Sequence, residues 1–376
     1  MNIAYIVPNL QQTGPIIVVQ SLVKFLANSG NRVTVYYIDE CESPIVMGCK
    51  TQKIFYDEPF PFDEFDVIHC HTAKSDLYAL FWINRMHRSL LVTTIHQDSF
   101  YTEKLRLGKI NGVFYTHLWL KVQKLFDGQI TISKQIKELY QKYFPKEINV
   151  IYNGVNCEEG GVDDIIVKQI RDFKKEGSIL LGTFALITKR KGLIQVLRLL
   201  IEKPIYQFLV IGNGPEVDAL KHYAKENGID DKVLFIGHID KPYNYMDDVD
   251  IYVMPSYSEA FGLAVVEAAL RHKAVACSDL DSFHEIFPHG EVEFFKFDNV
   301  SSLDLALQKI YKDKGKYEEL AFERASTHFV ASIMAQNTFD YYCIEIKKQI
   351  GTKKRLSWFS MTSVKLLRFL FCIVVR

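Results

Sequence analysis

The most constraining feature of this sequence is a repeated alternation of short, continuously apolar runs with longer amphipathic stretches. The apolar runs lack the polar alternation of a sheet that has one solvated face. Such runs are typical of parallel strands buried on both faces, and the amphipathic stretches predict crossover helices. The chain is therefore expected to be an α/β protein built from right-handed βαβ units.

The alternation forms two series with a polar, glycine-bearing break between them at 158–164. In the first series, strands are predicted at 2–7, 33–38, 66–70, 90–95, 129–132 and 148–151, and helices at 15–30, 73–86 and 134–144. In the second series, strands are predicted at 179–187, 206–211, 232–236, 250–254 and 274–277, and helices at 192–201, 215–227 and 262–271. We therefore expect two Rossmann-like, doubly wound domains that face each other across a cleft.

Four segments follow from this division. They are an N-terminal domain at 1–157, a C-terminal domain at 165–330, a helix at 331–350 expected to return to the N-terminal domain, and a tail at 351–376. The boundary between the two domains is predicted near 156–165. Open α/β sheets bind ligands beyond the carboxyl ends of their strands, so candidate site residues are sought there.

Composition excludes several classes of protein. The 376 residues carry 45 basic and 45 acidic side chains, so no excess of positive charge indicates a nucleic-acid partner. Seven cysteines without a C-x-x-C pair argue against a disulfide framework or a zinc ribbon and favour a reducing cytosol. The N-terminus lacks the features of a signal peptide, and no uncharged apolar run reaches the ~18 residues of a membrane span.

The tail at 351–376 differs from the rest of the chain, because it holds six basic residues and no acidic one beside Trp358, Phe359, Phe369 and Phe371. This pattern predicts peripheral attachment to an anionic membrane surface, with a packed C-terminal helix as the alternative. The segment at 100–124 also mixes basic and aromatic residues. It predicts either a membrane contact or an amphipathic helix pair that covers the sheet.

The segment at 248–268 is the richest in candidate site residues. An apolar strand leads to a loop with Glu259, and a helix that contains Glu267 begins near Gly262. The N–H groups of Phe261, Gly262 and Leu263 would be first-turn donors at the positive end of the helix dipole, which suits a phosphate. Carboxylates beside a phosphate would bind hydroxyl groups. Glu267 is therefore predicted to hold a ribose, and Glu259 the hydroxyls of a second sugar.

The pattern E-x-F-G-x4-E at 259–267 resembles the signature of the family 4 retaining glycosyltransferases, which have the GT-B fold. Further motifs of that family precede it in the expected order, and the similarity runs from residue 1 to about 347. They are V-I-Y-N-G-V at 150–155, K-G at 191–192, L-V-I-G-N-G-P-E at 209–216 and V-L-F-I-G at 233–237.

The resemblance implies a role for Lys191 at the donor diphosphate. The family arginine five residues earlier is Leu186 here, so Lys189 or Arg190 would take its place, or leaving-group stabilisation would be weaker. Gly14 would offer its backbone N–H to the donor phosphate, although the neighbouring Pro15 has none to give. Gly237 and His238 would lie in the loop that faces the nucleobase.

In the N-terminal domain the resemblance makes His71 the residue that faces the donor sugar across the cleft. His96 would serve either an acceptor-side or a structural role. His69 and His71 share one side of a strand, which suits a pair of metal ligands, but no third ligand at a fixed spacing accompanies them. We therefore expect no metal site.

The resemblance implies a metal-independent, retaining glycosyltransferase that moves a sugar from a nucleotide-sugar donor to a hydroxyl acceptor. His71, Lys191 and Glu259 would be its catalytic residues, and no separate cofactor is expected. A lipid-linked acceptor, surface polysaccharide or glycolipid assembly, and attachment to the cytoplasmic face of a membrane are further expectations. The alternatives are a catalytically silent partner of another transferase and a nucleotide-sugar 2-epimerase. NAD binding is disfavoured, because G-N-G-P-E at 212–216 lacks the third glycine of the dinucleotide fingerprint.

Overall fold

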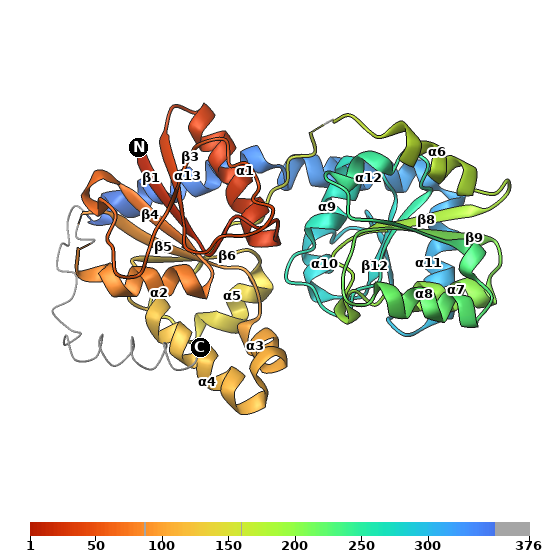
Figure 1. Cartoon of the computed structure of the whole chain (residues 1–376), viewed down its shortest axis with the longest axis horizontal. Coiled ribbons are helices and arrows are strands. Elements are labelled where there is room, and N and C mark those ends of the chain that lie inside the picture. Colours follow the sequence, from red (N-terminus) through yellow and green to blue (C-terminus); the bar gives the residue numbers. More distant parts are fainter. Residues whose placement is uncertain (86–87, 159, 350–376) are drawn as a thin grey trace. The chain divides into compact units, whose positions relative to one another are not determined.

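The computed structural model describes residues 1–85, 88–158 and 160–349, and the chain forms two compact units (Figure 1). Unit 1 comprises Met1–Gly154 together with the chain from Ala331 onward, and unit 2 comprises Val155–Val330. The basic tail predicted at 351–376 lies outside the described residues. Each unit is an α/β structure with its own parallel sheet, as the sequence predicted.

Unit 1 contains a seven-stranded parallel sheet with the strand order β3-β2-β1-β4-β5-β6-β7 in the described part of the chain. The strands are β1 (Asn2–Val7), β2 (Arg32–Tyr37), β3 (Lys50–Lys53), β4 (Val67–His71), β5 (Leu90–Ile95), β6 (Gly128–Thr131) and β7 (Asn149–Val150). Six of these strands coincide with the predicted apolar runs. Sequence reasoning missed β3, because this edge strand is polar and mostly exposed and so carries no apolar signal.

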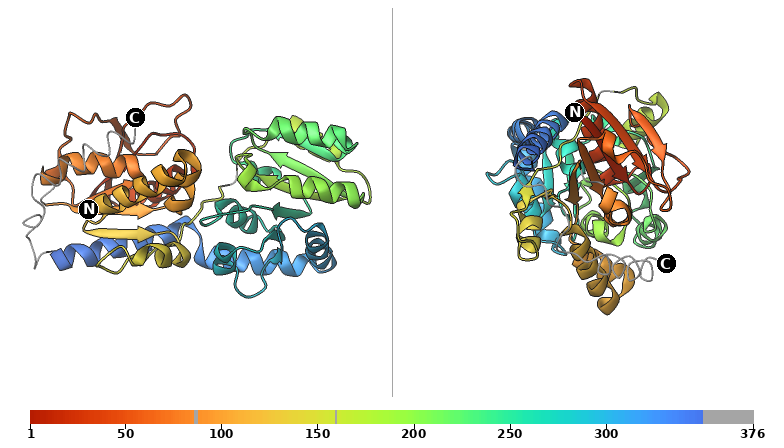
Figure 2. Two further views of the ribbon diagram at one scale, coloured as in Figure 1. Left: turned by 90° about the horizontal axis from the view of Figure 1, so that it is seen from below. Right: turned by 90° about the vertical axis from the view of Figure 1, so that its left-hand side faces the viewer.

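The helices of unit 1 lie on both faces of its sheet (Figure 2). They are α1 (Gly14–Asn28), α2 (Ala73–Trp82), α3 (Ser99–Leu107), α4 (Lys109–Gln123), α5 (Lys134–Gln141) and α13 (Ala331–Gln349). The prediction of one α-helix over 73–86 was wrong at its end, because α2 gives way to a 3-10 turn at Ile83–Arg85. Helix α13 packs against α1 and β5, and the hydroxyl of its buried Tyr342 lies 3.0 Å from that of Tyr5 on β1.

A buried carboxylate ties three elements of unit 1 together. Asp76 on α2 accepts hydrogen bonds from the Thr93 hydroxyl at 2.8 Å, the Trp119 indole N–H at 2.6 Å and the Gln123 amide at 3.0 Å. Burial raises the pKa of Asp76 to about 6, although the three donors oppose this shift. These bonds fix α4 and β5 to α2 within the apolar core of the unit.

Unit 2 contains a six-stranded parallel sheet with the order β10-β9-β8-β11-β12-β13 in the described residues. The strands are β8 (Ile179–Phe184), β9 (Tyr206–Ile211), β10 (Val233–Gly237), β11 (Ile251–Met254), β12 (Val275–Ser278) and β13 (Glu293–Phe295). The predicted strand at 179–187 was three residues too long, because the chain leaves the sheet after Phe184 to form a loop. The three-residue β13 was missed because it is too short to show a pattern.

The helices of unit 2 also lie on both faces of its sheet (Figure 2). They are α6 (Asp164–Phe173), α7 (Ile194–Glu202), α8 (Val217–Glu226), α9 (Leu263–Leu270), α10 (Asp281–Ile286), α11 (Val300–Lys312) and α12 (Lys314–His328). Helix α6 begins at the end of the segment interpreted as a linker. The Asp163 carboxylate caps this helix by accepting the Ile165 N–H at 2.8 Å, which is a helix-start signal that the polar composition concealed.

The strand order reverses once in each sheet, between β1 and β4 in unit 1 and between β8 and β11 in unit 2. Loops that leave the carboxyl ends of such strands diverge to opposite faces and leave a crevice between them. At these positions His71 ends β4 and Gly14 begins α1 in unit 1, and the loops of unit 2 carry Lys191 and Glu259. Most predicted site residues therefore lie at the two switch points.

Candidate functional site

Both carboxylate oxygens of Glu259, in the loop between β11 and α9, have partners. Oε1 accepts hydrogen bonds from Nζ of Lys191 at 2.7 Å and from the Ser256 hydroxyl at 2.9 Å, and Oε2 lies 3.2 Å from Nη1 of Arg190. The side chains of Glu259 and Lys191 are only 8% and 12% exposed. Burial alone would raise the pKa of Glu259, but the positive charges of Lys191 and Arg190 hold it below its ordinary value. The carboxylate is therefore ionised and charge-compensated.

Backbone contacts hold this charged cluster in place. Residues Lys189–Lys191 form one 3-10 turn, which ends at Gly192 with a φ of 64°. A Cβ atom on Gly192 would lie 2.1 Å from the carbonyl oxygen of Pro255, so only glycine allows the β8–α7 and β11–α9 loops to approach so closely. The Tyr257 N–H donates to the carbonyl oxygen of Arg190 at 2.8 Å and joins the same two loops.

The residues considered as replacements for the family arginine differ in their surroundings. Leu186 occupies the arginine position and is 67% exposed. Arg190 is half exposed and contacts Glu259 and the carbonyl oxygen of Ser258. Lys189 is exposed, and no described residue forms a hydrogen bond or an ion pair with its ammonium group. Arg190 thus belongs to the cluster, while Lys189 stands outside it.

Helix α9 begins beside the cluster. Gly262 has a φ of 96° and is the N-cap residue, and the buried ring of Phe261 packs edge-on against Phe329. Within the described residues, the N–H groups of Gly262, Leu263 and Ala264 have no hydrogen-bond acceptor. They are first-turn donors at the positive end of the helix, where an anion is favoured. The prediction named Phe261, Gly262 and Leu263, so two of its three residues belong to this set.

Glu267 lies about one turn further along α9. No described residue donates a hydrogen bond to its carboxylate, and burial raises its pKa to about 7, opposed by the nearby positive charge of Lys191. A largely buried carboxyl group without a protein donor can accept hydrogen bonds from a ligand. The two acidic residues of the motif thus differ, because Glu259 is paired and Glu267 is not.

The glycine turn after β9 packs directly on the loop after β8. A Cβ atom on Gly212 would lie 1.9 Å from the carbonyl oxygen of Ala185, and one on Gly214 would lie 2.2 Å from that of Ile187. Both glycines have positive φ angles. They are required for this close approach of the two backbones, which places the loop that leads to Lys191.

The residues predicted near a nucleobase lie at the end of β10. Gly237 has a φ of 90°, and its carbonyl oxygen accepts the Gly212 N–H at 2.6 Å. His238 is exposed, with Nε2 3.6 Å from a carboxylate oxygen of Asp240. This loop is thereby connected to the glycine turn after β9.

In unit 1, the predicted His71 ends β4 and is completely buried. Its Nδ1 lies 2.7 Å from Nε2 of His96, while its Nε2 is buried without a hydrogen-bond partner. The next residue, Thr72, has a φ of 76°, a strained angle for a β-branched residue. Gly14 is the first residue of α1, directly after the loop that follows β1.

His69 has a different environment from His71. Its Nδ1 lies 2.6 Å from the hydroxyl of Tyr342 on α13, and its Nε2 lies 2.7 Å from the hydroxyl of Thr94. Both ring nitrogens are therefore occupied by protein groups. Across the described residues, no cluster of three or more histidine, cysteine, aspartate or glutamate side chains has the arrangement of a metal site.

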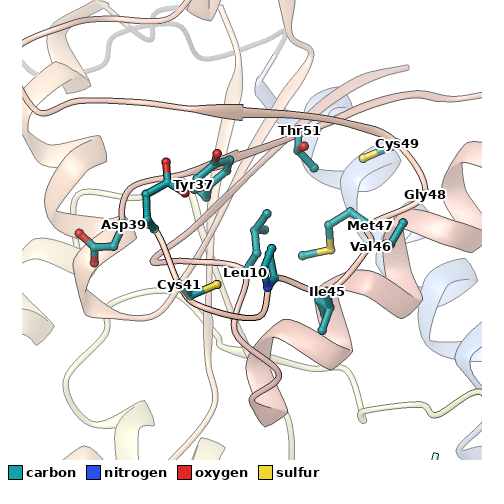
Figure 3. A pocket seen from close by; sticks show the side chains of 12 residues that line it. Leu10, Tyr37, Asp39, Cys41, Ile45, Val46, Met47, Gly48, Cys49 and Thr51 are labelled. Atoms are coloured by element: carbon teal, nitrogen blue, oxygen red, sulfur yellow. The ribbon is translucent and has the colours of Figure 1, made fainter. Parts of the chain in front are cut away.

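Unit 1 also contains a cavity of about 600 Å³ that the sequence did not predict (Figure 3). The loop from Asp39 to Cys49, between β2 and β3, forms most of its wall. Leu10 and Met47 are buried apolar residues in its lining, and Tyr37 and Thr51 add hydroxyl groups. This loop is joined to the β1–α1 loop, because the Ile45 N–H donates to the carbonyl oxygen of Leu10 at 2.9 Å.

Helices α3 and α4 form a hairpin within the segment that mixes basic and aromatic residues (Figure 1). One face of α4 packs into the core of unit 1, as the helix-pair alternative predicted. The hairpin also exposes large apolar side chains, namely Tyr101, Leu105, Ile110, Val113 and Phe114. Exposed basic residues lie among them at Lys104, Arg106, Lys109 and Lys121. Within residues 1–85, 88–158 and 160–349, no helix has the length and apolar character needed to cross a bilayer.

Two family models match the chain. The model described as glycosyl transferases group 1 matches residues 166–325, and the model described as glycosyltransferase family 4 matches residues 58–159. The O-antigen biosynthesis glycosyltransferase WclY of Escherichia coli is 30% identical over 301 residues, covering 76% of this chain and 82% of that protein. The phosphatidyl-myo-inositol mannosyltransferase of Mycobacterium leprae is 27% identical, covering 61% of this chain and 59% of that protein.

Solved structures show the same fold. The Anabaena protein HepE in complex with UDP and glucose has a TM-score of 0.74 at 16% identity, covering 91% of this chain and 99% of that one. WaaG, a glycosyltransferase involved in lipopolysaccharide biosynthesis, has a TM-score of 0.66 at 15% identity, covering 90% of this chain and 99% of that one. Two family models, the 30% identity to WclY and the GT-B architecture all agree. The chain therefore belongs to the group 1 glycosyltransferases.

Proposed function

We propose that this glycosyltransferase transfers a sugar, with retention of anomeric configuration and without a metal ion, from a nucleoside-diphosphate sugar to a hydroxyl acceptor. The observation that carries the proposal is the charged cluster of Lys191, Arg190 and Glu259 beside the open amide groups of α9. The UDP and glucose bound by the structural neighbour HepE support a nucleotide-sugar donor.

The donor diphosphate would lie against the start of α9. The N–H groups of Gly262 and Leu263 and the ammonium of Lys191 would stabilise the negative charge that grows on the leaving group as the glycosidic bond breaks. These groups are already fixed by the protein, so they need no reorganisation during the reaction. They would supply the charge stabilisation that a divalent cation provides elsewhere.

The two glutamates would bind hydroxyl groups rather than attack the sugar. Glu267 has no protein donor, so its carboxylate would accept hydrogen bonds from the ribose diol of the nucleotide. Glu259 would accept from hydroxyls of the transferred sugar while it holds Lys191 in position. We assign no carboxylate as nucleophile. The departing phosphate oxygen would assist in deprotonating the acceptor, and His71 would hydrogen-bond the transferred sugar.

The acceptor would be a sugar of a lipid-linked glycan. The name of WclY, an O-antigen biosynthesis glycosyltransferase, supports a role in surface polysaccharide assembly. We propose the cavity of unit 1 as its binding place, because the cavity offers hydroxyl and apolar groups and adjoins the β1–α1 loop.

Thr51→Trp, which would fill the cavity from β3, should reduce transfer but not nucleotide binding. Gln52→Trp is the control, because neighbouring residues of a strand point to opposite faces. Equal transfer rates in the two variants would remove the cavity from the proposal.

The enzyme would act at the cytoplasmic face of a membrane. Exposed apolar and basic side chains of the α3–α4 hairpin have the composition of an interfacial contact, and the basic residues at 351–376 would add attraction to anionic lipids.

Thermal unfolding in the presence of UDP, GDP, ADP, CDP and dTDP tests the donor proposal. A ligand that binds only the folded state stabilises it, by about 2.7 kcal/mol at a hundred times its Kd. We expect one of these nucleotides to raise the Tm of the wild type and to raise that of Glu267→Ala less. If none of them changes the Tm of the wild type at millimolar concentration, the donor proposal is wrong.

A further inference from the structure

Three loops of unit 2 meet on one side-chain amide, that of Gln195 in the first turn of α7. Its Nε2 donates hydrogen bonds to the carbonyl oxygens of Pro255 at 2.6 Å and Gly192 at 3.2 Å, and its Oε1 accepts the Asp298 N–H at 2.6 Å. The side chain of Gln195 is only 3% exposed. Its three partners lie in the loops after β11, β8 and β13, so a single buried side chain joins segments that are distant in the sequence.

The partners of Gln195 leave its carboxamide one favourable orientation. A glutamine side chain has two N–H donors and a carbonyl oxygen, and here two carbonyl oxygens face the donors while one N–H faces the oxygen. The reversed carboxamide would set its own oxygen against both backbone oxygens. Because buried polar groups need partners, a glutamate or a methionine of similar size would leave at least two of these contacts unmade.

The loop after β13 is tied to the same region a second time through the side chain of Asp298. This residue has a φ of 54°, and its carboxylate accepts a hydrogen bond from the hydroxyl of Tyr257 at 2.8 Å. The Tyr257 N–H in turn donates to the carbonyl oxygen of Arg190 at 2.8 Å. A path of hydrogen bonds from Gln195 thus returns to the 3-10 turn at Lys189–Lys191 through the β11–α9 loop.

We propose that Gln195 is a positioning residue for the charged cluster, because its carboxamide fixes the separation of the loops that carry Lys191 and Glu259. Lys191 directly precedes Gly192, and Glu259 lies four residues after Pro255. A change in the distance between the two carbonyl oxygens held by Gln195 therefore moves the ammonium relative to the carboxylate. A misplacement of about 1 Å can cost about 100-fold in rate.

The clamp made by Gln195 is a property of unit 2 alone. Only its benefit to the leaving diphosphate rests on the proposed function. The two parts are therefore tested separately, first without any substrate and then in the reaction.

Hydrogen exchange followed by NMR on the full-length, ligand-free protein tests the clamp. In the wild type, the Asp298 N–H should exchange slowly although its side chain is 51% exposed, and so should both Nε2 protons of Gln195. Rapid exchange at these positions would overturn the proposal before any variant is made. Gln195→Met, which keeps the size of the side chain but has no N–H donor, should speed exchange of the Asp298 and Tyr257 N–H groups by about tenfold or more. Unchanged exchange at Tyr257 would show that Gln195 does not hold the loops together.

Gln207→Met is the matched control. Gln207 on β9 is 2% exposed and also bridges backbone groups, since its Nε2 donates to the carbonyl oxygen of Phe173 at 2.8 Å and its Oε1 accepts the Lys175 N–H at 2.7 Å. It lies near the amino end of its strand, whereas the charged cluster lies beyond the carboxyl ends. Both variants lose the contacts of a buried carboxamide, so we expect a lower Tm in both.

The effect on the reaction should separate the two variants. With the nucleotide sugar selected by thermal unfolding, kcat should fall about tenfold or more in Gln195→Met with a smaller change in donor KM, and both constants should stay within about threefold in Gln207→Met. Equal kcat values in the two folded variants would contradict the positioning role of Gln195. Absence of transfer by the wild type would instead refute the proposed function, and the exchange measurement would still decide whether the clamp exists.

Discussion

Nζ of Lys191 lies 2.7 Å from Oε1 of Glu259, so the cation predicted to bind a diphosphate is held by the carboxylate predicted to bind a sugar. Because an ammonium group has three donors, Lys191 can keep this bond and still donate to a phosphate oxygen. The ion pair places Lys191 before the donor arrives, which avoids the cost of ordering a flexible side chain on binding.

Lys191→Ala should lower kcat by about 10²- to 10³-fold, because one preorganised donor to a developing negative charge is worth that much. It also leaves the largely buried Glu259 with Arg190 as its remaining charged partner. Lys189→Ala is the matched control, since Lys189 lies in the same 3-10 turn outside the cluster, and we expect its kcat to change less than about threefold. Comparable losses in the two variants would show that the cluster does not define the phosphate site.

The pKa of Glu267, raised to about 7 by burial, predicts proton release on nucleotide binding. In the ligand-free protein this carboxyl opposes folding increasingly as the pH rises from about 4.5 to 7, because the folded state holds the proton more tightly than the unfolded chain. Ribose hydroxyls would favour the charged form and lower the pKa again. Nucleotide affinity should therefore fall as the pH drops below about 7.

Calorimetric titration with the nucleotide at pH 7, in two buffers that differ in ionisation enthalpy, measures this proton release. The wild type should release a fraction of a proton, and Glu267→Gln should release none and bind more weakly. Identical proton counts in both proteins would place the ribose elsewhere.

Gly192→Ala should lower activity by more than the strain of a positive φ angle alone would cause. Gly192 and Gly228 both have a φ of 64°, but an added Cβ meets the Pro255 carbonyl oxygen only at Gly192, while at Gly228 it meets nothing within 4 Å. Each variant bears the positive-φ penalty of about 1 kcal/mol. Only Gly192→Ala should additionally separate the loops that carry Lys191 and Glu259. We expect a lower Tm in both variants and a loss of kcat confined to Gly192→Ala, measured by thermal unfolding and steady-state kinetics.

The α3–α4 hairpin should contribute to membrane binding. Ile110 and Leu105 are 83% and 68% exposed, and replacing both by serine removes apolar contacts with the interface while leaving the core intact. We expect at least about a tenfold weaker association with vesicles of phosphatidylethanolamine and phosphatidylglycerol, which corresponds to about 1.4 kcal/mol. Ile165→Ser is the control, because Ile165 is 77% exposed on α6 of unit 2.

Vesicle co-sedimentation at low and high salt separates the contributions of apolar and basic side chains to membrane binding, because salt screens only the basic ones. Removal of residues 352–376 should also weaken pelleting and leave nucleotide binding unchanged, since every predicted donor residue precedes 268. Unchanged pelleting in both the hairpin variant and the truncated protein would refute the membrane contact.

The sequence predicted the fold well, because buried parallel strands have a nearly continuous apolar pattern. It failed at β3, whose polar K-T-Q-K is stabilised by pairing with β2 rather than by burial. It also failed at α6, because the polar segment that contains the N-cap residue Asp163 was interpreted as a linker. Short or edge elements depend on tertiary partners, and a single sequence does not display those partners.

Lys191 and Glu259, predicted from the sequence motifs, lie in loops at the switch point of unit 2, but the motifs did not reveal that their charges pair. Nothing in the spacing of Lys191 and Glu259, 68 residues apart, indicates an ion pair between them. Likewise, His71 ends β4 and His96 follows the neighbouring strand β5, which explains their proximity. The absence of a hydrogen-bond partner at Nε2 of His71 depends on packing that the sequence does not encode locally.

The most direct test of the central claim measures acceptor-dependent release of the nucleoside diphosphate from the donor sugar that passes the thermal-shift test. The assay uses lipid extract from a membrane that carries surface glycan, in the presence of EDTA. The wild type should release the nucleotide and form a glycosidic bond of the donor's own anomeric configuration by NMR, and Glu259→Ala should lose this activity while its Kd for the nucleotide stays within about threefold. Dependence on a divalent cation, an inverted product or full activity in Glu259→Ala would contradict the account.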